Sequence, residues 1–385
     1  MFVTLLVYIF FLLIAADVYL FFQFIWRLTK SLLLRSLWFL PTTLLLGALL
    51  SFFFSGYGID FQGIFTVIFI GVSFPKIVFA FITLLDIPFR IFFKWKIYPF
   101  TIIAAIVSLL ILYVILYGSL IGVSKFTYKE VTFSSTDLPQ NFDGLRIVQL
   151  SDLHIGFWKD TSQIVKMVEM VNSQSPDLVV ITGDLVHYRA EELDGYEDIL
   201  SQLYAPYGVY SVLGNHDYGG YVRWKSLIQQ AENLLELQRR QANMGWKLLN
   251  NENVIFAKEE EKIALIGVEN NGKPPFHGDG DLPKAMRGTE NILFKILLSH
   301  DPSHWRAEVI DTDINLTLSG HTHGGQFAIG KHSYFSARYP EWGGLYMENN
   351  QGLYINTGIG YAIVPFRFGV LPEITIITLK RKIIQ

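Results

Sequence analysis

Cysteine is absent from the 385 residues of the chain. The protein therefore has no disulfide, no cysteine nucleophile and no thiolate ligand for a metal. Any metal site must be built from imidazole, carboxylate and amide groups, which suit several divalent ions. The absence does not identify the redox compartment, because a chain without thiols is compatible with either one.

Histidine is absent from residues 1–123, and acidic residues are rare there. This part has seven Lys or Arg and three Asp, which gives a net charge of +4. From residue 124 onward there are 24 Lys or Arg, 31 Asp or Glu and all nine His, which gives a net charge of −7. An acidic segment that holds every histidine fits metal binding, whereas nucleic-acid binding favours a basic face. We therefore expect no nucleic-acid partner.

Four apolar runs in the first 123 residues are each long enough to cross a hydrocarbon core, which takes about 20 helical residues. They cover approximately 2–26, 37–54, 63–85 and 100–123. The first run has no basic segment before it and no small-residue cleavage site after it, so we do not interpret it as a removable signal peptide. Residues 1–123 are predicted to form a four-span transmembrane anchor, and residues 124–144 a linker and lead-in.

The loops between these runs predict an orientation, because Lys and Arg favour cytoplasmic loops. The loops after the first and third runs are basic, whereas the loop between the second and third has one charged residue, Asp60. The basic residues are Arg27, Lys30 and Arg35 in one loop, and Arg90, Lys94 and Lys96 in the other. We expect a multi-pass protein of the cytoplasmic (inner) membrane, with its C-terminal domain on the periplasmic or extracellular face.

Asp17 and Lys76 are charged residues inside the first and third runs, where an isolated charge is costly. If both runs cross in the same direction, the two residues lie at a similar depth. We hypothesise a buried ion pair that fixes the packing of the helices. In the alternative, each side chain reaches the interface or a water pocket separately.

From Leu145 onward, short apolar segments alternate with amphipathic ones. Strands are predicted at 145–150, 177–182, 209–213, 263–268, 292–298, 313–318, 353–356 and 373–379, and helices at 161–173, 191–204 and 223–244. Strands that alternate with helices predict an α/β fold. The polar segments 270–289 and 330–351 are expected to be surface loops.

Polar side chains suited to metal binding or proton transfer follow several of these predicted strands. They are Asp152, His154, Asp184, Asn215, His216, His300, His321 and His323. The carboxyl ends of strands are where open α/β sheets build their sites. In an extended backbone, the two outer residues of Asp-x-His and His-x-His point to one side. Carboxylates and neutral imidazoles suit Zn, Fe, Mn or related divalent ions.

The order of these motifs resembles that of the calcineurin-like metallophosphoesterases. The motifs are Ser151-Asp152-Leu153-His154, Gly183-Asp184, Gly214-Asn215-His216-Asp217, a lone His300, and Gly320-His321-Thr322-His323. The resemblance extends over residues 145–380. Gly324-Gly325-Gln326 and the stretch 365–375 are similar to a bacterial membrane-associated branch of that family. The resemblance implies a four-layer αββα metallophosphoesterase domain at 145–385.

The resemblance also implies a role for each motif residue. One divalent metal would be bound by Asp152, His154 and His323, and a second by Asn215, His300 and His321. Asp184 would bridge the two, because dications about 3.5–4 Å apart must share anions. The ions would be Mn, Fe or Zn. Water between them would lose a proton near neutral pH and attack phosphorus in line. His216 would donate a proton to the leaving oxygen or stabilise the transition state.

Other polar residues have two interpretations each. Asp217 either orients His216 or caps a following helix. His187 stands where many relatives carry an acid, which leaves its role open. Arg338 and Arg367 either clamp a phosphate or form structural ion pairs. His277, His304 and His332 are expected at the surface or beside the ligands rather than among them.

We predict a membrane-anchored dimetal phosphoesterase that contacts membrane lipid and hydrolyses a phosphodiester or a lipid-linked phosphate. The lipid-linked substrate is suggested only by the expected location beside a bilayer. One alternative is a metal-binding envelope protein without catalysis. Another is a membrane sensor whose spans are the receptor and whose domain is the output.

Overall fold

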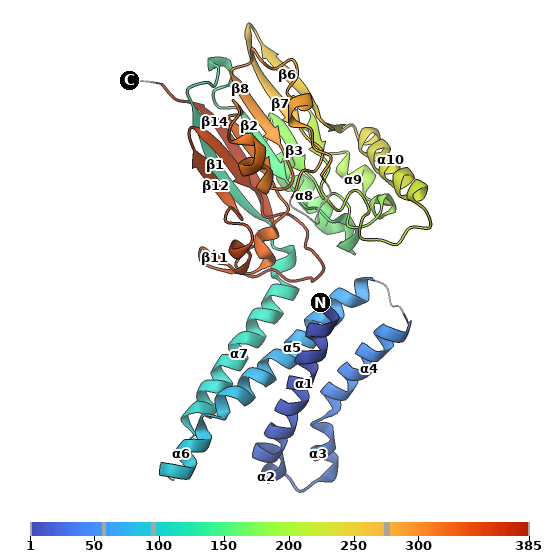
Figure 1. Cartoon of the computed structure of the whole chain (residues 1–385), viewed down its shortest axis with the longest axis vertical. Helices are drawn as coiled ribbons and strands as arrows, with labels where there is room; N and C mark the ends of the chain where they lie inside the picture. Colours follow the sequence, from blue (N-terminus) through green and yellow to red (C-terminus); the bar gives the residue numbers. More distant parts are fainter. Residues whose placement is uncertain (1, 56–58, 94–97, 273–277, 384–385) are drawn as a thin grey trace. The chain divides into compact units, whose positions relative to one another are not determined.

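The computed structural model describes residues 2–55, 59–93, 98–272 and 278–383. The chain divides into two compact units. The helical unit comprises Met1–Ile121 with Ile363–Phe366, and the α/β unit comprises Gly122–Ala362 with Arg367–Gln385 (Figure 1). The division follows the change in the sequence from long apolar runs to short apolar segments.

The helical unit contains long apolar helices, as its sequence predicts. Its helices are α1 (Phe2–Leu20), a π-helical turn (Phe21–Ile25), α2 (Trp26–Leu28), α3 (Leu32–Leu37), α4 (Leu40–Ser55), α5 (Ile59–Thr83), α6 (Asp86–Phe93) and α7 (Pro99–Leu120). Among the described residues, three stretches are long and apolar enough to cross a membrane: Val7–Leu28, Gly63–Phe93 and Pro99–Ser124. Helix α4, at the second predicted span, has 16 residues. It is about 24 Å long, which is less than a hydrocarbon core of about 30 Å.

The predicted ion pair between Asp17 and Lys76 is confirmed. Lys76 Nζ lies 2.8 Å from Asp17 Oδ1. Thr42 Oγ1 donates to the other carboxylate oxygen, and Trp38 Nε1 donates to the backbone oxygen of Asp17 at 3.1 Å. The carboxylate is buried and joins α1 to α4 and α5, so the alternative of two separately solvated side chains is wrong.

Two six-stranded sheets form the centre of the α/β unit. In order across the first sheet, the strands are β1 (Thr127–Ser135), β14 (Glu373–Arg381), β2 (Arg146–Leu150), β3 (Leu178–Thr182), β4 (Val209–Val212) and β5 (Lys247–Leu248). The second sheet contains β12 (Gly344–Glu348), β13 (Gln351–Ile355), β9 (Leu316–Ser319), β8 (Phe294–Leu298), β7 (Glu261–Gly267) and β6 (Glu252–Lys258). Strands β2 to β5 are parallel, as are β7, β8, β9 and β13.

Strand β3 illustrates how the sequence builds the layers. All five of its residues are buried, and side chains alternate between the two faces of a strand. Val179 and Ile181 pack with the helices, whereas Leu178 and Val180 pack between the two sheets. A run that is apolar on both faces therefore belongs to a central strand.

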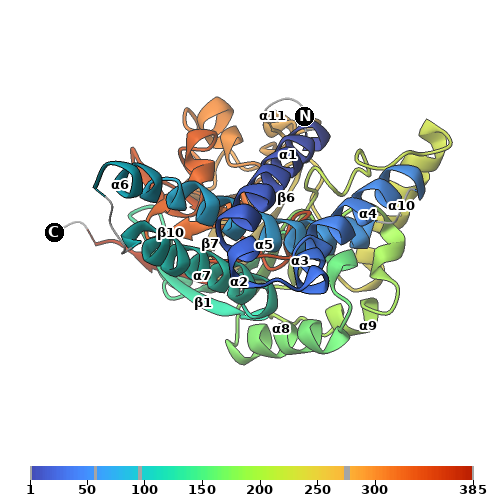
Figure 2. The same cartoon turned by 90° about the horizontal axis from the view of Figure 1, so that it is seen from below.

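Helices cover the outer faces of both sheets. Helices α8 (Thr161–Ser173), α9 (Glu197–Leu200) and α10 (Leu227–Asn243) contribute to the core on the first sheet. Helix α11 (Leu282–Ala285) and a π-helical turn (Trp305–Val309) pack on the second. Helices α8 and α9 lie on the opposite side of the unit from α11 (Figure 2). The predicted four-layer αββα fold is confirmed.

The edge strands are the main difference from the prediction. The stretch expected to be a linker contains β1, which pairs in parallel with β14 along its length. Strands β6 and β12 are also edge strands, and β12 lies in a segment expected to be a loop. An edge strand keeps one side and often one face in water, so its composition is close to that of a loop. The helix predicted at 191–204 is two short pieces, Ala190–Leu193 and α9.

Candidate metal centre

The predicted site residues meet at the carboxyl ends of five strands, as expected. Strand β2 is followed by Asp152 and His154, β3 by Asp184, and β4 by Asn215 and His216. In the second sheet, β8 is followed by His300, and β9 by His321 and His323. The ends of both sheets therefore contribute to one site.

Five of these residues have an unusual backbone conformation. The φ angles are 51° at Asp152, 43° at His154, 53° at Asp184, 70° at His321 and 49° at His323. Each lies in the left-handed region, which costs a residue other than glycine about 1–3 kcal/mol. The prediction that Asp-x-His and His-x-His converge because the backbone is extended is therefore wrong. They converge because the chain turns sharply after each strand.

Two glycines of the motifs make room for the carboxylates. A Cβ atom on Gly214 would overlap the side chain of Asp184 and lie 2.5 Å from its backbone nitrogen. A Cβ atom on Gly320 would overlap the side chains of Ser151 and Asp152. Both motifs require glycine because the neighbouring carboxylates approach the backbone so closely.

Asp152, His154 and His323 form the first half of the site. His323 Nε2 lies 3.3 Å from Asp152 Oδ1 and 3.0 Å from His154 Nε2. One ligand atom from each residue lies within 4.8 Å of the other two, and all three side chains are buried. These are the residues that the sequence assigns to the first metal.

Asp184, Asn215, His300 and His321 form the second half. His300 Nε2 lies 3.2 Å from Asp184 Oδ2 and 3.3 Å from His321 Nδ1. Asn215 Oδ1 lies 2.8 Å from His321 Nδ1. Asp184 Oδ2 is also 3.7 Å from Nε2 of His154, so this carboxylate lies between the two halves.

The donor atoms fit one or more divalent cations. Carboxylate and amide oxygens face imidazole nitrogens across short distances. The oxygens carry lone pairs, and an imidazole nitrogen binds a metal through its lone pair. Asn215 donates with its Nδ2 to Tyr221 at 2.8 Å, which leaves Oδ1 facing the site. A cation would satisfy the converging lone pairs, and the set of nitrogen and oxygen ligands suits Mn, Fe or Zn.

Burial and charge control protonation at the site. Burial lowers the pKa of His154 and His323 well below the usual value, and that of His321 to about 4, which favours imidazoles with a free lone pair. Burial opposes ionisation of Asp184, but the charges of His300 and His216 outweigh it and lower its pKa. Burial alone would lower the pKa of His300, but Asp184 raises it to about 10.

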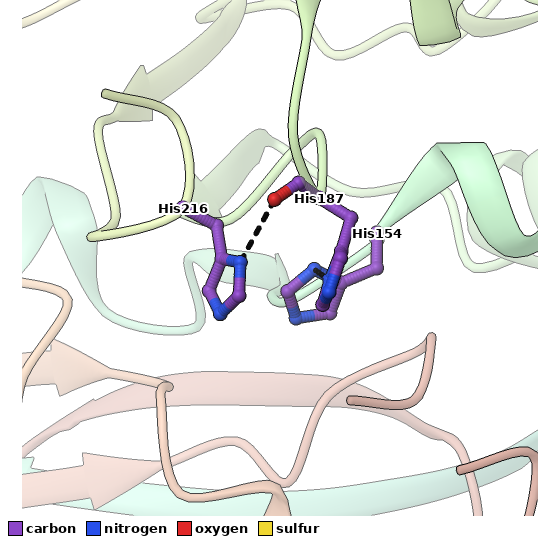
Figure 3. Close-up of side chains that lie close together, drawn as sticks. All are labelled: His154, His187 and His216. Atoms are coloured by element: carbon purple, nitrogen blue, oxygen red, sulfur yellow. Dashed lines mark hydrogen bonds between the residues drawn. The ribbon is translucent and has the colours of Figure 1, made fainter. Parts of the chain in front are cut away.

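His216 lies beside the first half of the site and is partly exposed. Its Nδ1–H donates to the backbone oxygen of His187 at 2.9 Å, so Nε2 is the ring nitrogen that remains to take up or give a proton (Figure 3). Its ring stacks on Tyr221 with 4.3 Å between centroids. The ring is therefore fixed in one orientation next to the ligands.

Asp217 stabilises the loop that carries Asn215 and His216. Its carboxylate accepts from the backbone N–H of Gly214 at 2.8 Å and of Val186 at 3.1 Å. The alternative that Asp217 caps the following helix is wrong, because α10 begins at Leu227 and is capped by Ser226. Any orienting effect on His216 acts through the backbone.

The two arginines predicted to bind phosphate have different surroundings. Arg367 is fully buried; it donates to the backbone oxygens of Gly360 and Thr357 and lies 3.2 Å from Nδ1 of His323. These partners are two carbonyl groups and an imidazole rather than the acid of an ion pair. Arg338 is exposed and lies over the ring of Tyr339 at 5.9 Å.

Of the remaining histidines outside the motifs, His332 lies at the surface as expected, whereas His304 is buried. His304 lies 2.9 Å from Ser299 Oγ, and His332 is on β11 (His332–Ser333). His277 lies outside the described residues.

The sequence did not indicate two residues that contact His321. Its Nε2 lies 2.9 Å from the hydroxyl of Tyr339, which donates to Asp301 at 3.4 Å. A proton on Nε2 places the lone pair of His321 on Nδ1, which faces Asn215 and His300. Asp301 follows His300 directly, but Tyr339 is distant in sequence and only the folded chain brings it to the site.

The match to a family model agrees with this geometry. Residues 145–325 match the model of the calcineurin-like phosphoesterases. The chain is 31% identical over 267 residues to metallophosphoesterase YkuE of Bacillus subtilis, an alignment that covers 65% of this chain and 84% of that protein. The chain belongs to the calcineurin-like phosphoesterase family and is a metal-dependent phosphoric ester hydrolase.

Two further proteins are similar to the chain. A transmembrane protein with metallophosphoesterase domain from Danio rerio is 34% identical over 263 residues, which are 66% of this chain and 57% of that protein. The chain thus spans less than two thirds of that relative. The structure of Haemophilus influenzae NAD nucleotidase has a TM-score of 0.37 and 17% identity, over 56% of this chain and 45% of that one.

Proposed function

We propose that the protein is a membrane-anchored phosphoesterase that uses two divalent metal ions. The observation that carries this proposal is the position of Asp184, whose carboxylate faces His300 of one half of the site and His154 of the other. Asp152, His154 and His323 would hold one ion, and Asn215, His300 and His321 the other. A single buried carboxylate between two ligand sets is what two neighbouring dications require.

The two ions, when bound, would supply positive charge that polarises the phosphoryl group and lowers the pKa of water. The chain's own groups would orient the substrate and move the proton. His216 presents Nε2 beside the site, because Nδ1 donates to the oxygen of His187. Nε2 would carry the proton that the leaving oxygen takes up, or would stabilise the transition state. Arg338, which is exposed, would contact the phosphate of the substrate.

The apolar helices support an anchoring role for the helical unit. Three stretches are long enough to cross a membrane, and α4 would complete the predicted four spans if the bilayer thins locally. The basic loops favour an orientation with the α/β unit on the periplasmic or extracellular face of the cytoplasmic membrane. A relative described as a transmembrane protein with the same domain supports membrane association. The substrate would be a phosphodiester or a lipid-linked phosphate.

The test uses the full chain purified in detergent. The metal is removed with a chelator and restored as Mn, Zn or Fe, and hydrolysis of a soluble monoester, a soluble diester and a lipid-linked phosphate is compared. Asp184→Asn is the inactive reference. We expect turnover only after metal is restored, with two metal ions per chain. Equal turnover in wild type and Asp184→Asn would refute the proposal, and metal binding without turnover would favour a catalytically silent metal-binding protein. A reporter fused after the last residue, active only in the cytoplasm, would refute the orientation.

A further inference from the structure

His187 lies in the loop after β3 and is not among the seven proposed ligands. Its side chain is buried. Three rings surround it: Tyr188 at 4.1 Å, Phe157 at 4.2 Å and His216 at 4.3 Å between centroids. Contacts on this many sides fix the orientation of the imidazole and therefore the direction of its nitrogens.

One nitrogen of His187 faces a proposed metal ligand. Nδ1 of His187 lies 2.9 Å from Nδ1 of His154 (Figure 3). The other nitrogen of His154, Nε2, faces the opposite way, at 3.0 Å from Nε2 of His323 and 3.7 Å from Asp184. His154 thus has one nitrogen for the site and one for His187.

The two nitrogens of a neutral histidine cannot both carry the proton. A nitrogen that binds a metal needs its lone pair, so the proton of His154 must be on Nδ1, and Nδ1 then requires an acceptor. Nδ1 of His187 is at hydrogen-bond distance to accept it. If His187 donated instead, the proton of His154 would move to Nε2 and block the metal.

We propose that His187 is a positioning residue that accepts the Nδ1–H of His154 and keeps Nε2 of His154 available to the first metal. The proposal rests on the proposed function, since it takes His154 as a ligand. An uncharged acceptor would orient His154 without adding a further carboxylate beside Asp152 and Asp184.

The backbone of His187 has a separate contact, which makes the proposal testable. Its carbonyl oxygen accepts from Nδ1 of His216 at 2.9 Å. A change of the side chain at position 187 keeps this carbonyl. The ring of His187 also stacks on that of His216, so metal affinity, and not turnover, is the measurement that isolates the contact of the side chain with His154.

The experiment compares His187→Leu, which removes the acceptor, with His187→Asn, whose amide oxygen takes the place of Nδ1. His332→Leu, at an exposed position on β11, is the matched control. Metal content and metal affinity are measured with the full chain in detergent by competition with a chelator. We expect His187→Leu to bind one of the two metals about 10–100-fold more weakly, as is usual when the partner of a ligand is lost. His187→Asn should restore most of the affinity.

Three outcomes would overturn the proposal. The first is a wild-type affinity in His187→Leu, and the second is an equal loss in the Leu and Asn variants, which would indicate packing alone. The third is a wild type that binds three metal ions and a His187→Leu variant that binds two, which would make the imidazoles themselves a metal site. A wild type that binds no metal would refute the proposed function, and this result is distinct from the other three.

Discussion

The backbone N–H of His216 donates a hydrogen bond to Oδ1 of Asp184 at 2.9 Å. The other oxygen of the same carboxylate faces His300 at 3.2 Å and His154 at 3.7 Å. The residue proposed to act on the substrate is thus bonded to the residue proposed to bridge the metals. Metal binding at Asp184 and the orientation of the loop of His216 are therefore expected to depend on each other.

Asp184→Asn should abolish the binding of two metals, because an amide provides one neutral oxygen where two dications share an anion. Loss of a residue that only supports a metal ligand lowers metal affinity or activity about 10–100-fold. Asp184 is itself a proposed ligand of both metals, so its loss should lower kcat/KM by more than about 100-fold. Metal content and turnover are the measurements. Asp311→Asn, at an exposed position, is the control and should match the wild type. Full metal content in Asp184→Asn would contradict the assignment.

His216→Ala should keep both metals and lower kcat by about 10²–10⁴-fold, the usual contribution of a general acid. The nitrogen that faces the site is lost, whereas the seven proposed ligands remain. A chain with unchanged turnover would exclude His216 from the reaction, and a chain without metal would make it a ligand. His332→Ala serves as the control for the loss of a histidine at an exposed site.

Gly214→Ala should lower the free energy of unfolding by about 1–3 kcal/mol and weaken metal binding, since the new methyl group overlaps Asp184. Gly220→Ala is the matched control, because a Cβ atom there has nothing within 4 Å. Thermal unfolding with and without metal is the measurement. The steric explanation fails if the two alanine variants behave alike.

Metal removal should destabilise the α/β unit, because ions that bind only the folded chain stabilise it by mass action. At a free metal concentration about 100 times Kd, the expected gain is about 2.7 kcal/mol in the free energy of unfolding. The Tm should rise with added metal in the wild type and stay constant in Asp184→Asn. A Tm that rises equally in both would indicate metal binding elsewhere.

Lys76→Met should destabilise the helical unit, because it leaves the buried Asp17 without its partner at 2.8 Å. A charge in the apolar interior of a membrane costs about 2.5–3.5 kcal/mol. The double variant Asp17→Asn with Lys76→Met should recover most of this loss. Lys30→Met, at an exposed position, is the control. Thermal unfolding in detergent tests the pair, and additive effects of the two single changes would refute it.

The residue types of the sequence determined the fold class and the members of the site. The alternation of Leu178, Val179, Val180 and Ile181 between two apolar faces identifies a central strand without reference to any other part of the chain. The metal-ligating types at the strand ends are equally local, because carboxyl ends of parallel strands meet at one edge of a sheet. The pairing of Asp17 with Lys76 could also be predicted from the sequence, because an unpaired charge is costly inside an apolar run.

Only the tertiary structure decided the contacts that join distant segments. The left-handed turns at Asp152 and His321 bring ligands together where extended backbone was expected, and surrounding contacts supply the energy that these conformations cost. Strand β1 became part of a sheet because β14, far along the chain, pairs with it. The partner of His154 is His187, and that of His321 is Tyr339. A hydrogen bond between distant residues depends on the distance and angle that the whole fold sets, which residue type and local spacing do not contain.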